Sequence, residues 1–188
     1  VVWSRIADEA AAIEQQAVQL ASSCRSGGKF VRGLFSGGTF CSEAQTIFQP
    51  ELPELYSNIP VKGAKSLVDP MVSTGHMVID LGDDIFTMGR PHPMIDFSLR
   101  QKRILTEAED ADTAVILLDV VLGYGSNADP AAELIVVISQ VSHHVPVICS
   151  VTGTDQDFQN KASTIRRLEA AGAVVMASNA SACRLTLA

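Results

Sequence analysis

Residues 29–39 read KFVRGLFSGGT, an apolar run that leads into two glycines and a threonine. The run has the length and composition of a buried strand. Residues 39–48 follow with a helical pattern, so this part of the sequence predicts a strand, a tight turn and a helix. Glycines at the turn let the backbone bend sharply and approach a ligand closely.

The same alternation of apolar runs and helical patterns continues along the chain. Further strands are expected at 76–81, 113–120, 145–151 and 173–176, and further helices at 94–108, 129–143, 158–171 and the end of the chain. Short apolar strands that alternate with helices are typical of a parallel sheet covered on both faces. We therefore expect an α/β, flavodoxin-like fold with five strands in the order 2-1-3-4-5. The proline-containing segment 50–74 is expected to be an irregular connection.

The first residues have a different pattern. Apolar residues recur three and four positions apart over 4–25, which predicts an amphipathic helix that ends at Ser26-Gly27-Gly28. We expect residues 1–28 to be a helical linker from an upstream domain, or a helix packed on the sheet edge, and residues 29–188 to form one domain.

Composition excludes several classes of protein. The 188 residues carry a net charge of −7, so neither nucleic acid nor a membrane is expected as a partner. No apolar stretch approaches the roughly 20 residues that a membrane span needs. The cysteines are not spaced as C-x-x-C pairs, so no metal site and a reduced, cytoplasmic setting are expected; they are Cys24, Cys41, Cys149 and Cys183.

Ligands of such sheets bind at the carboxyl ends of the strands, where the strand order reverses. Two turns are expected there, Ser36-Gly37-Gly38-Thr39 and Gly123-Tyr124-Gly125-Ser126. In the first turn, free N–H groups and the positive end of the helix dipole favour an anion, and two hydroxyls add donors. The candidate phosphate- or substrate-binding residues are Ser36, Gly37, Gly38, Thr39, Gly123, Gly125 and Ser126. The alternative is a plain tight turn with Thr39 as the N-cap.

The loop 82–93 carries the densest group of polar side chains. The adjacent carboxylates Asp83 and Asp84 suit general base chemistry or a hydrogen bond to a substrate amine or hydroxyl. Arg90 is a candidate for a bidentate contact to phosphate or carboxylate. Flanking prolines stiffen the chain around His92, which makes it a candidate catalytic residue together with the two carboxylates. The alternative is a solvated acidic loop before a helix.

Asp119 interrupts an otherwise apolar strand near its carboxyl end. A buried carboxylate is costly unless it is paired, so Asp119 is a fourth candidate catalytic residue. The alternative is a structural residue satisfied by neighbouring N–H groups.

Several of these stretches resemble a known group of enzymes. Phe35–Thr39 with Glu43, residues 145–148 and residues 168–173 resemble the α subunit of succinyl-CoA synthetase. The resemblance is closer to the FdrA family of predicted acyl-CoA synthetases, in which stretches like FVRGLFSGGT, DLGDD…GRPHPMID and LLDVVLGYG…DP recur.

The resemblance implies the ligase domain of the NDP-forming acyl-CoA synthetases, with a CoA-binding domain upstream. The Ser36–Thr39 turn would hold a transferring phosphoryl group. For FdrA proteins it further implies oxamate carbamoyl transfer in allantoin (purine) catabolism. The substrates would be oxamate and an acyl- or carbamoyl-phosphate, in a homo- or hetero-oligomer. CoA or a nucleotide would be bound by other parts of the protein.

One departure from the family keeps alternatives open. Succinyl-CoA synthetase carries a phosphohistidine shortly after the fourth strand, but residues 152–157 read TGTDQD. An NDP-forming acyl-CoA ligase with a displaced phosphohistidine, for which His92 is the candidate, is therefore one alternative. A non-catalytic domain that senses phosphate or helps assembly is another.

Overall fold

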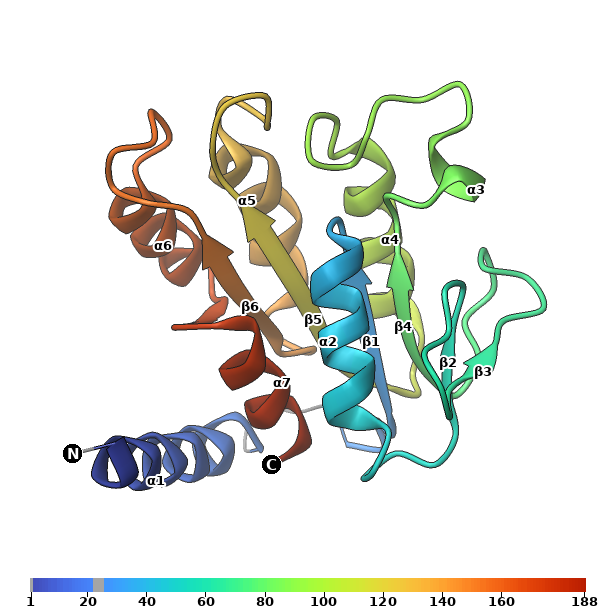
Figure 1. Cartoon of the computed structure of the whole chain (residues 1–188), viewed down its shortest axis with the longest axis horizontal. Coiled ribbons are helices and arrows are strands. Elements are labelled where there is room, and N and C mark those ends of the chain that lie inside the picture. Colours follow the sequence, from blue (N-terminus) through green and yellow to red (C-terminus); the bar gives the residue numbers. More distant parts are fainter. Residues whose placement is uncertain (1, 22–25) are drawn as a thin grey trace.

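A single parallel sheet of seven strands runs through the molecule, with helices on both of its faces (Figure 1). The structure is a computed structural model that describes residues 2–21 and 26–188, with side chains from residue 10 onward. Cys24 and the end of the first predicted helix lie outside the described residues.

The strands are β1 (Phe30–Phe35), β2 (Leu55–Ser57), β3 (Lys65–Ser66), β4 (His76–Asp80), β5 (Thr113–Val121), β6 (Val147–Thr152) and β7 (Val174–Met176). Their order is β3-β2-β4-β1-β5-β6-β7, and every neighbouring pair is parallel. The five strands from β4 to β7 in this order reproduce the expected 2-1-3-4-5 arrangement.

The expected strand count of five is wrong because the segment 50–74 contributes two more strands at the β4 edge. The strands β2 and β3 have three and two residues, too few for a pattern of alternation to show in the sequence. These two segments form strands because β2 pairs with β4 and β3 pairs with β2, not because their own residues favour a strand.

The helices are α1 (Val2–Ala21), α2 (Gly38–Phe48), α3 (Asp84–Thr87), α4 (Ser98–Glu109), α5 (Pro130–Val141), α6 (Lys161–Ala170) and α7 (Asn179–Leu187). The helices α4, α5 and α6 cover one face of the sheet, and α1, α2 and α7 cover the other (Figure 1). The short helix α3 lies inside the expected polar loop 82–93.

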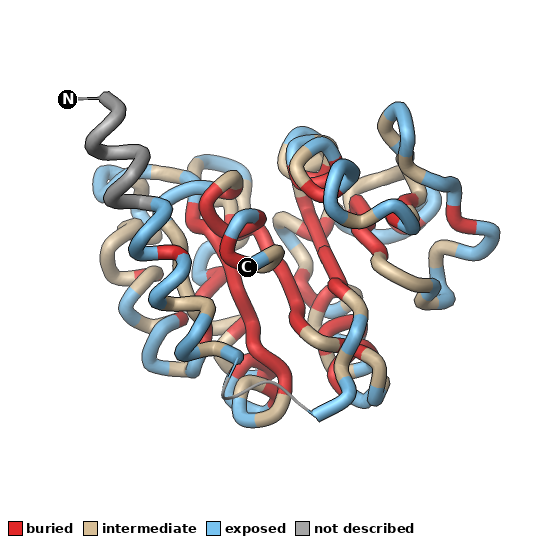
Figure 2. The backbone as a smooth tube through the Cα atoms, turned by 90° about the horizontal axis from the view of Figure 1, so that it is seen from below, coloured by how far each residue is buried: buried red, intermediate tan, exposed pale blue. Residues whose placement is uncertain are grey.

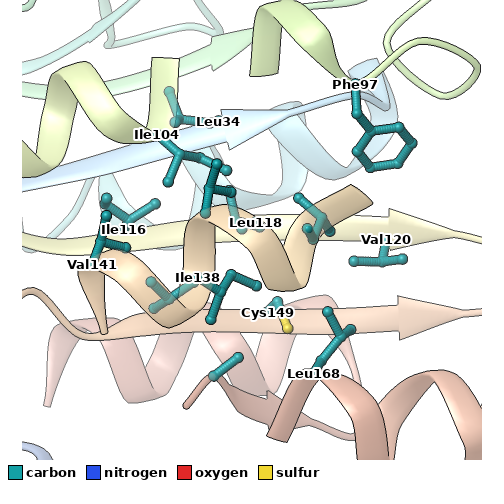
Figure 3. Close-up of a cluster of buried hydrophobic side chains, with 14 of the residues drawn as sticks. Leu34, Phe97, Ile104, Ile116, Leu118, Val120, Ile138, Val141, Cys149 and Leu168 are labelled. Atoms are coloured by element: carbon teal, nitrogen blue, oxygen red, sulfur yellow. The ribbon is translucent and has the colours of Figure 1, made fainter. Parts of the chain in front are cut away.

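Alternate strand residues build two apolar cores. Leu34, Ile116 and Leu118 face α4 and α5, and Figure 3 shows them interleaved with Ile104 and Ile138. Their neighbours in the strands face the opposite layer, in the core that α2 and α7 cover. Buried residues therefore follow the strands, while exposed residues lie on the outer sides of the helices (Figure 2).

The first helix packs against the sheet side that α7 covers. Ile13 is buried there, and Ala17 and Leu20 line a shallow pocket with residues of β5, β6 and α7. The helix α1 follows the predicted amphipathic pattern. Among the residues that the structure describes, no helix is long and apolar enough to cross a membrane.

The helix α4 also brings charged side chains into the protein. Near the amino end of β1, Glu107 lies 2.9 Å from Arg32 Nε and 2.5 Å from Arg103 Nε. Ser73 donates a hydrogen bond of 2.6 Å to Glu107, and Asp110 lies 2.8 Å from Arg32 Nη2. We call this group the amino-end cluster; it ties the connection before β4 to the sheet.

Candidate functional site

The carboxyl ends of three strands meet where the strand order reverses. The strand β1 lies between β4 and β5, with Phe35 opposite Asp80 and Leu34 opposite Leu118. The connection after β1 leads to one side of the sheet, and the later strands lie on the other side. Open α/β sheets bind ligands in the crevice that this reversal produces.

The amino end of α2 opens into this crevice without a side-chain cap. Gly37 is the N-cap residue, and no side chain among the described residues accepts a hydrogen bond from the first turn. Cys41 N–H is the first to find a helical partner, at 3.0 Å from the Gly37 carbonyl oxygen. The N–H groups of Gly38, Thr39 and Phe40 are therefore free of intrahelical partners. We call residues 36–40 the α2 cup.

The alternative in which Thr39 caps the helix is wrong, since Gly37 occupies that position and Thr39 is exposed in the first turn. A side chain at Gly37 or Gly38 would crowd the carboxylates of the neighbouring strands. A Cβ on Gly37 would lie 3.2 Å from Asp119 Oδ2, and one on Gly38 would lie 2.9 Å from Asp80 Oδ2. Two carboxylates thus approach the cup from the two strands that flank β1.

Asp119 is buried and fully engaged. It is 1% exposed, and its Oδ1 lies 2.7 Å from Nη2 of Arg100, which is fully buried. Ser36 N–H donates to Asp119 Oδ1 at 2.8 Å, and Ser36 Oγ lies 3.1 Å from both carboxylate oxygens. The hydroxyl of Ser36 is therefore directed at Asp119 rather than at the cup. Asp119 therefore fixes the start of the turn. This matches the alternative of a structural residue satisfied by a neighbouring N–H group, with a buried arginine as an additional partner.

Arg100 was not anticipated from the sequence. It projects from α4 and also donates a hydrogen bond of 2.9 Å to the Leu34 carbonyl oxygen, so it links α4 to β1 directly below the cup. Burial lowers the pKa of the Arg100 guanidinium, and the neighbouring Asp119 carboxylate opposes this effect.

Asp80 is a second residue that the sequence analysis missed. It ends β4, is 8% exposed, and accepts a hydrogen bond of 2.8 Å at Oδ1 from Gly82 N–H. Burial raises the pKa of Asp80, and the nearby Asp119 and Asp83 raise it further, whereas the Gly82 N–H group and His92 act in the opposite direction. A carboxylate at the end of an apolar strand was the available signal, as it was for Asp119.

His92 lies beside Asp80. Met94 N–H donates to His92 Nδ1 at 3.2 Å, so the neutral imidazole carries its proton on Nε2. A Cβ on Gly82 would lie 2.6 Å from His92 Nε2 and 3.1 Å from Asp80 Oδ1. Glycine at position 82 therefore leaves the space in which the imidazole approaches the end of β4.

The other polar residues of this loop lie elsewhere. Asp83 caps α3 by accepting a hydrogen bond of 3.0 Å from Ile85 N–H, and Asp84 is exposed in the first turn of that helix. Arg90 is exposed and lines a separate pocket of about 230 Å³ together with Asp96. No contact recorded for the described residues brings these three side chains to the α2 cup.

The polar groups of the second glycine turn are largely satisfied by Gln159. Gly123 N–H donates to Gln159 Oε1 at 3.3 Å, and Gln159 Nε2 donates to Ser126 Oγ at 2.9 Å. Gly125 is exposed. Gly125, Ser126 and His92 line an open hollow of about 300 Å³, which places this turn next to the histidine rather than on the cup. Gln159 had no signal in the sequence.

Comparison with known proteins agrees with this architecture. The family model described as CoA-ligase matches residues 34–188. A stretch of 158 residues, 80% of this chain, is 37% identical to the uncharacterized protein YahF of Escherichia coli (strain K12). This stretch covers 31% of YahF, so the chain spans about a third of that relative's length. The chain belongs to the CoA-ligase family, as its resemblance to the succinyl-CoA synthetase ligase domain predicted.

Proposed function

We propose that this chain is the ligase domain of an acyl-CoA synthetase-like enzyme of the FdrA type, and that the α2 cup holds the phosphoryl group of an acyl- or carbamoyl-phosphate. The observation that carries the proposal is the uncapped first turn of α2 at the reversal of the strand order. Backbone N–H groups at a helix start bind phosphate through hydrogen bonds and the helix dipole.

The contacts beneath the cup support a rigid site. Asp119 holds Ser36 N–H, and Arg100 holds Asp119, so the turn is fixed before any ligand arrives. Donors that are already oriented need not reorganise when charge develops on a leaving phosphate, which is how such sites favour reaction. The bare backbone at Gly37 and Gly38 gives an anion access to these donors.

The reaction we favour is carbamoyl transfer between carbamoyl phosphate and oxamate in allantoin catabolism. The oxamate nitrogen attacks the carbamoyl carbon, the new C–N bond forms, and the C–O bond to phosphate breaks. Phosphate leaves with the electron pair of that bond, and the nitrogen loses a proton to a base or to water. This step needs phosphate to be held and released, and it needs no histidine at residues 152–157.

A nucleotide-dependent acyl-CoA ligase is the second candidate, favoured by the position of His92 Nε2 next to Asp80 and Gly82. Incubation of the whole protein with labelled ATP tests it. Acid-labile, base-stable phosphate that disappears in His92→Gln would support the ligase, and its absence would favour carbamoyl transfer.

The proposal is tested by removing one N–H group from the cup. Gly37 has φ −117° and ψ 117°, the region that a residue before proline prefers, and proline is favoured at the first helical position. Gly38→Pro therefore removes the N–H group without breaking the helix, and Gly38→Ala is the matched control, in which the Cβ displaces Asp80 Oδ2 in the same way.

We expect Gly38→Pro in the whole protein to bind inorganic phosphate roughly 10- to 150-fold more weakly than Gly38→Ala. This corresponds to about 1.5–3 kcal/mol for one hydrogen bond to a charged group. Titration calorimetry measures the affinity, and phosphate release from carbamoyl phosphate with oxamate measures turnover. Equal binding and turnover in the two variants would contradict the proposal. Weaker binding with unchanged turnover would favour the non-catalytic phosphate-sensing or assembly domain.

A further inference from the structure

One carboxylate oxygen of Asp80 points at the α2 cup. Asp80 Oδ1 is held by Gly82 N–H, but Oδ2 lies 2.9 Å from the point that a Cβ on Gly38 would occupy. Among the described residues no hydrogen bond to Oδ2 is recorded, and the residue is only 8% exposed. The residue as a whole is largely buried, but Oδ2 itself remains accessible, so a ligand in the α2 cup can reach it.

The charges around Asp80 make its negative form unfavourable. Asp119 faces it from β5 and Asp83 follows it along the chain, while His92 faces it from the loop before α4. Arg100, on α4, is already occupied by Asp119. Burial and the two carboxylates therefore raise the pKa of Asp80, and the polar contacts of Gly82 and His92 compensate only in part.

An anion in the cup would make this conflict stronger. A phosphoryl group that accepts from the free N–H groups of α2 lies next to Gly38, and hence next to Asp80 Oδ2. Two negative groups in contact repel each other, most of all where water is excluded. A carboxylic acid in the same place donates a hydrogen bond to the anion instead.

We propose that Asp80 carries a proton when the α2 cup is occupied and donates a hydrogen bond from Oδ2 to an oxygen of the bound anion. The inference rests on the proposed function, because it requires an anion in the cup. It adds a side-chain contact to a site otherwise built from backbone, and it couples the uptake of the anion to the uptake of one proton.

The experiment titrates the whole protein with sulfate between pH 5 and 8.5, since sulfate keeps its charge over this range. Calorimetry of the wild type, Asp80→Asn and His92→Gln gives the affinities, and circular dichroism confirms that each variant is folded. Asparagine keeps an acceptor for Gly82 N–H and offers an uncharged N–H donor to the anion. The variant His92→Gln removes the other nearby group that gains positive charge in acid.

In the wild type we expect the sulfate affinity to fall, by up to about tenfold per pH unit, once the pH exceeds the pKa of Asp80. The variant Asp80→Asn is expected to lose this dependence and to bind sulfate about tenfold or more tightly than the wild type at pH 8.5. His92→Gln should retain the dependence. Titrations in buffers of different ionisation enthalpy should show about one proton taken up per sulfate in the wild type and none in Asp80→Asn.

The possible outcomes distinguish a failure of this inference from a failure of the proposed anion binding. Sulfate binding that Asp80→Asn leaves unchanged or weakens at pH 8.5 would overturn the inference alone. Loss of the pH dependence in His92→Gln would assign the proton to the histidine and would also overturn it. Absence of binding in all proteins at every pH would overturn the anion-binding cup itself. If Asp80→Asn is unfolded, the proton count in the wild type and in His92→Gln decides the question.

Discussion

Two buried ionic groups lie at opposite ends of β1, and α4 supplies charged side chains to both. In the amino-end cluster, Arg32 and Arg103 share Glu107, and Asp110 completes the charge balance. At the carboxyl end, Arg100 is paired with Asp119, while the nearby Asp80 has no cationic partner among the described ion pairs. In the first group every charge has an oppositely charged partner. In the second group the carboxyl group of Asp80 and several N–H groups of α2 have no such partner in the protein.

The difference separates structural charge from functional charge. A buried cluster in which every charge has an oppositely charged partner fixes one arrangement of the chain, here the connection before β4, and leaves no charge for a ligand. An arrangement that leaves N–H donors and a carboxyl group without protein partners can offer them to a ligand. The comparison therefore supports the proposed ligand site at the carboxyl end of β1 by an argument that does not use the family resemblance.

The largest expected effect is on the amino-end cluster. Glu107→Ala leaves two buried arginines without their shared carboxylate, so we expect the free energy of unfolding to fall by about 3–5 kcal/mol. Urea denaturation of the whole protein measures it, with the exposed Glu109→Ala on the same helix as the control. A loss below about 1 kcal/mol would show that the cluster is not the structural unit described above.

The matching change at the carboxyl end of β1 has a smaller structural effect and an additional functional one. Asp119→Asn removes the charge beside Arg100 but keeps an acceptor for Ser36 N–H, so we expect a loss of about 2–3 kcal/mol. Phosphate affinity should fall as well, because the start of the α2 cup loosens. Glu107→Gln, measured where both proteins are folded, should leave that affinity unchanged; equal effects of the two variants would remove the distinction between the clusters.

A third change affects the geometry near His92 more than the fold. Gly82→Ala places a methyl group 2.6 Å from His92 Nε2, and the half-buried imidazole can move away. The methyl group also lies 3.0 Å from the Ser36 carbonyl oxygen, so we expect a loss of about 1–3 kcal/mol in unfolding free energy and a clear loss of turnover if His92 takes part in the reaction. Asp84→Ala, an exposed change in the same loop, is the control. Full turnover in Gly82→Ala would show that the reaction does not require the His92 imidazole to lie beside Gly82.

The smallest expected effect is a pH dependence of stability. Because the pKa of Asp80 is raised in the folded protein, its contribution to stability is present in acid and is lost as the pH rises through that pKa. At neutral pH, Asp80→Asn should therefore be more stable than the wild type, by less than about 1 kcal/mol, and the difference should vanish towards pH 4. Urea titrations at several pH values measure it; a constant difference would show that Asp80 does not titrate abnormally.

The sequence predicted the layers and the strand order well. Apolar runs such as 113–120 identify buried parallel strands, and the crossing rules of such sheets leave few possible orders. The strands β2 and β3 escaped prediction because they exist through pairing with β4 rather than through their own residues. Short strands added at the edge of a sheet, and their register, depend on tertiary contacts that a local sequence pattern does not show.

The candidate site was predicted in outline. Glycines after a strand identify the α2 cup, and a carboxylate in an apolar strand identifies Asp119. The sequence could not show that Arg100 turns inward, since it lies in a helix rich in charged residues with no distinguishing pattern. It also grouped Asp84 and Arg90 with His92 by proximity along the chain, although the folded loop directs them to different places.

The two-residue strand β3 closes one side of the sheet with Lys65, whose ammonium group meets the Glu54 carboxylate at 2.5 Å. An edge strand this short, with a charged side chain, exposes few backbone N–H and C=O groups with which a strand of another chain could pair. On this side, edge-to-edge aggregation is discouraged, and any assembly of subunits must use side-chain surfaces rather than a continued sheet.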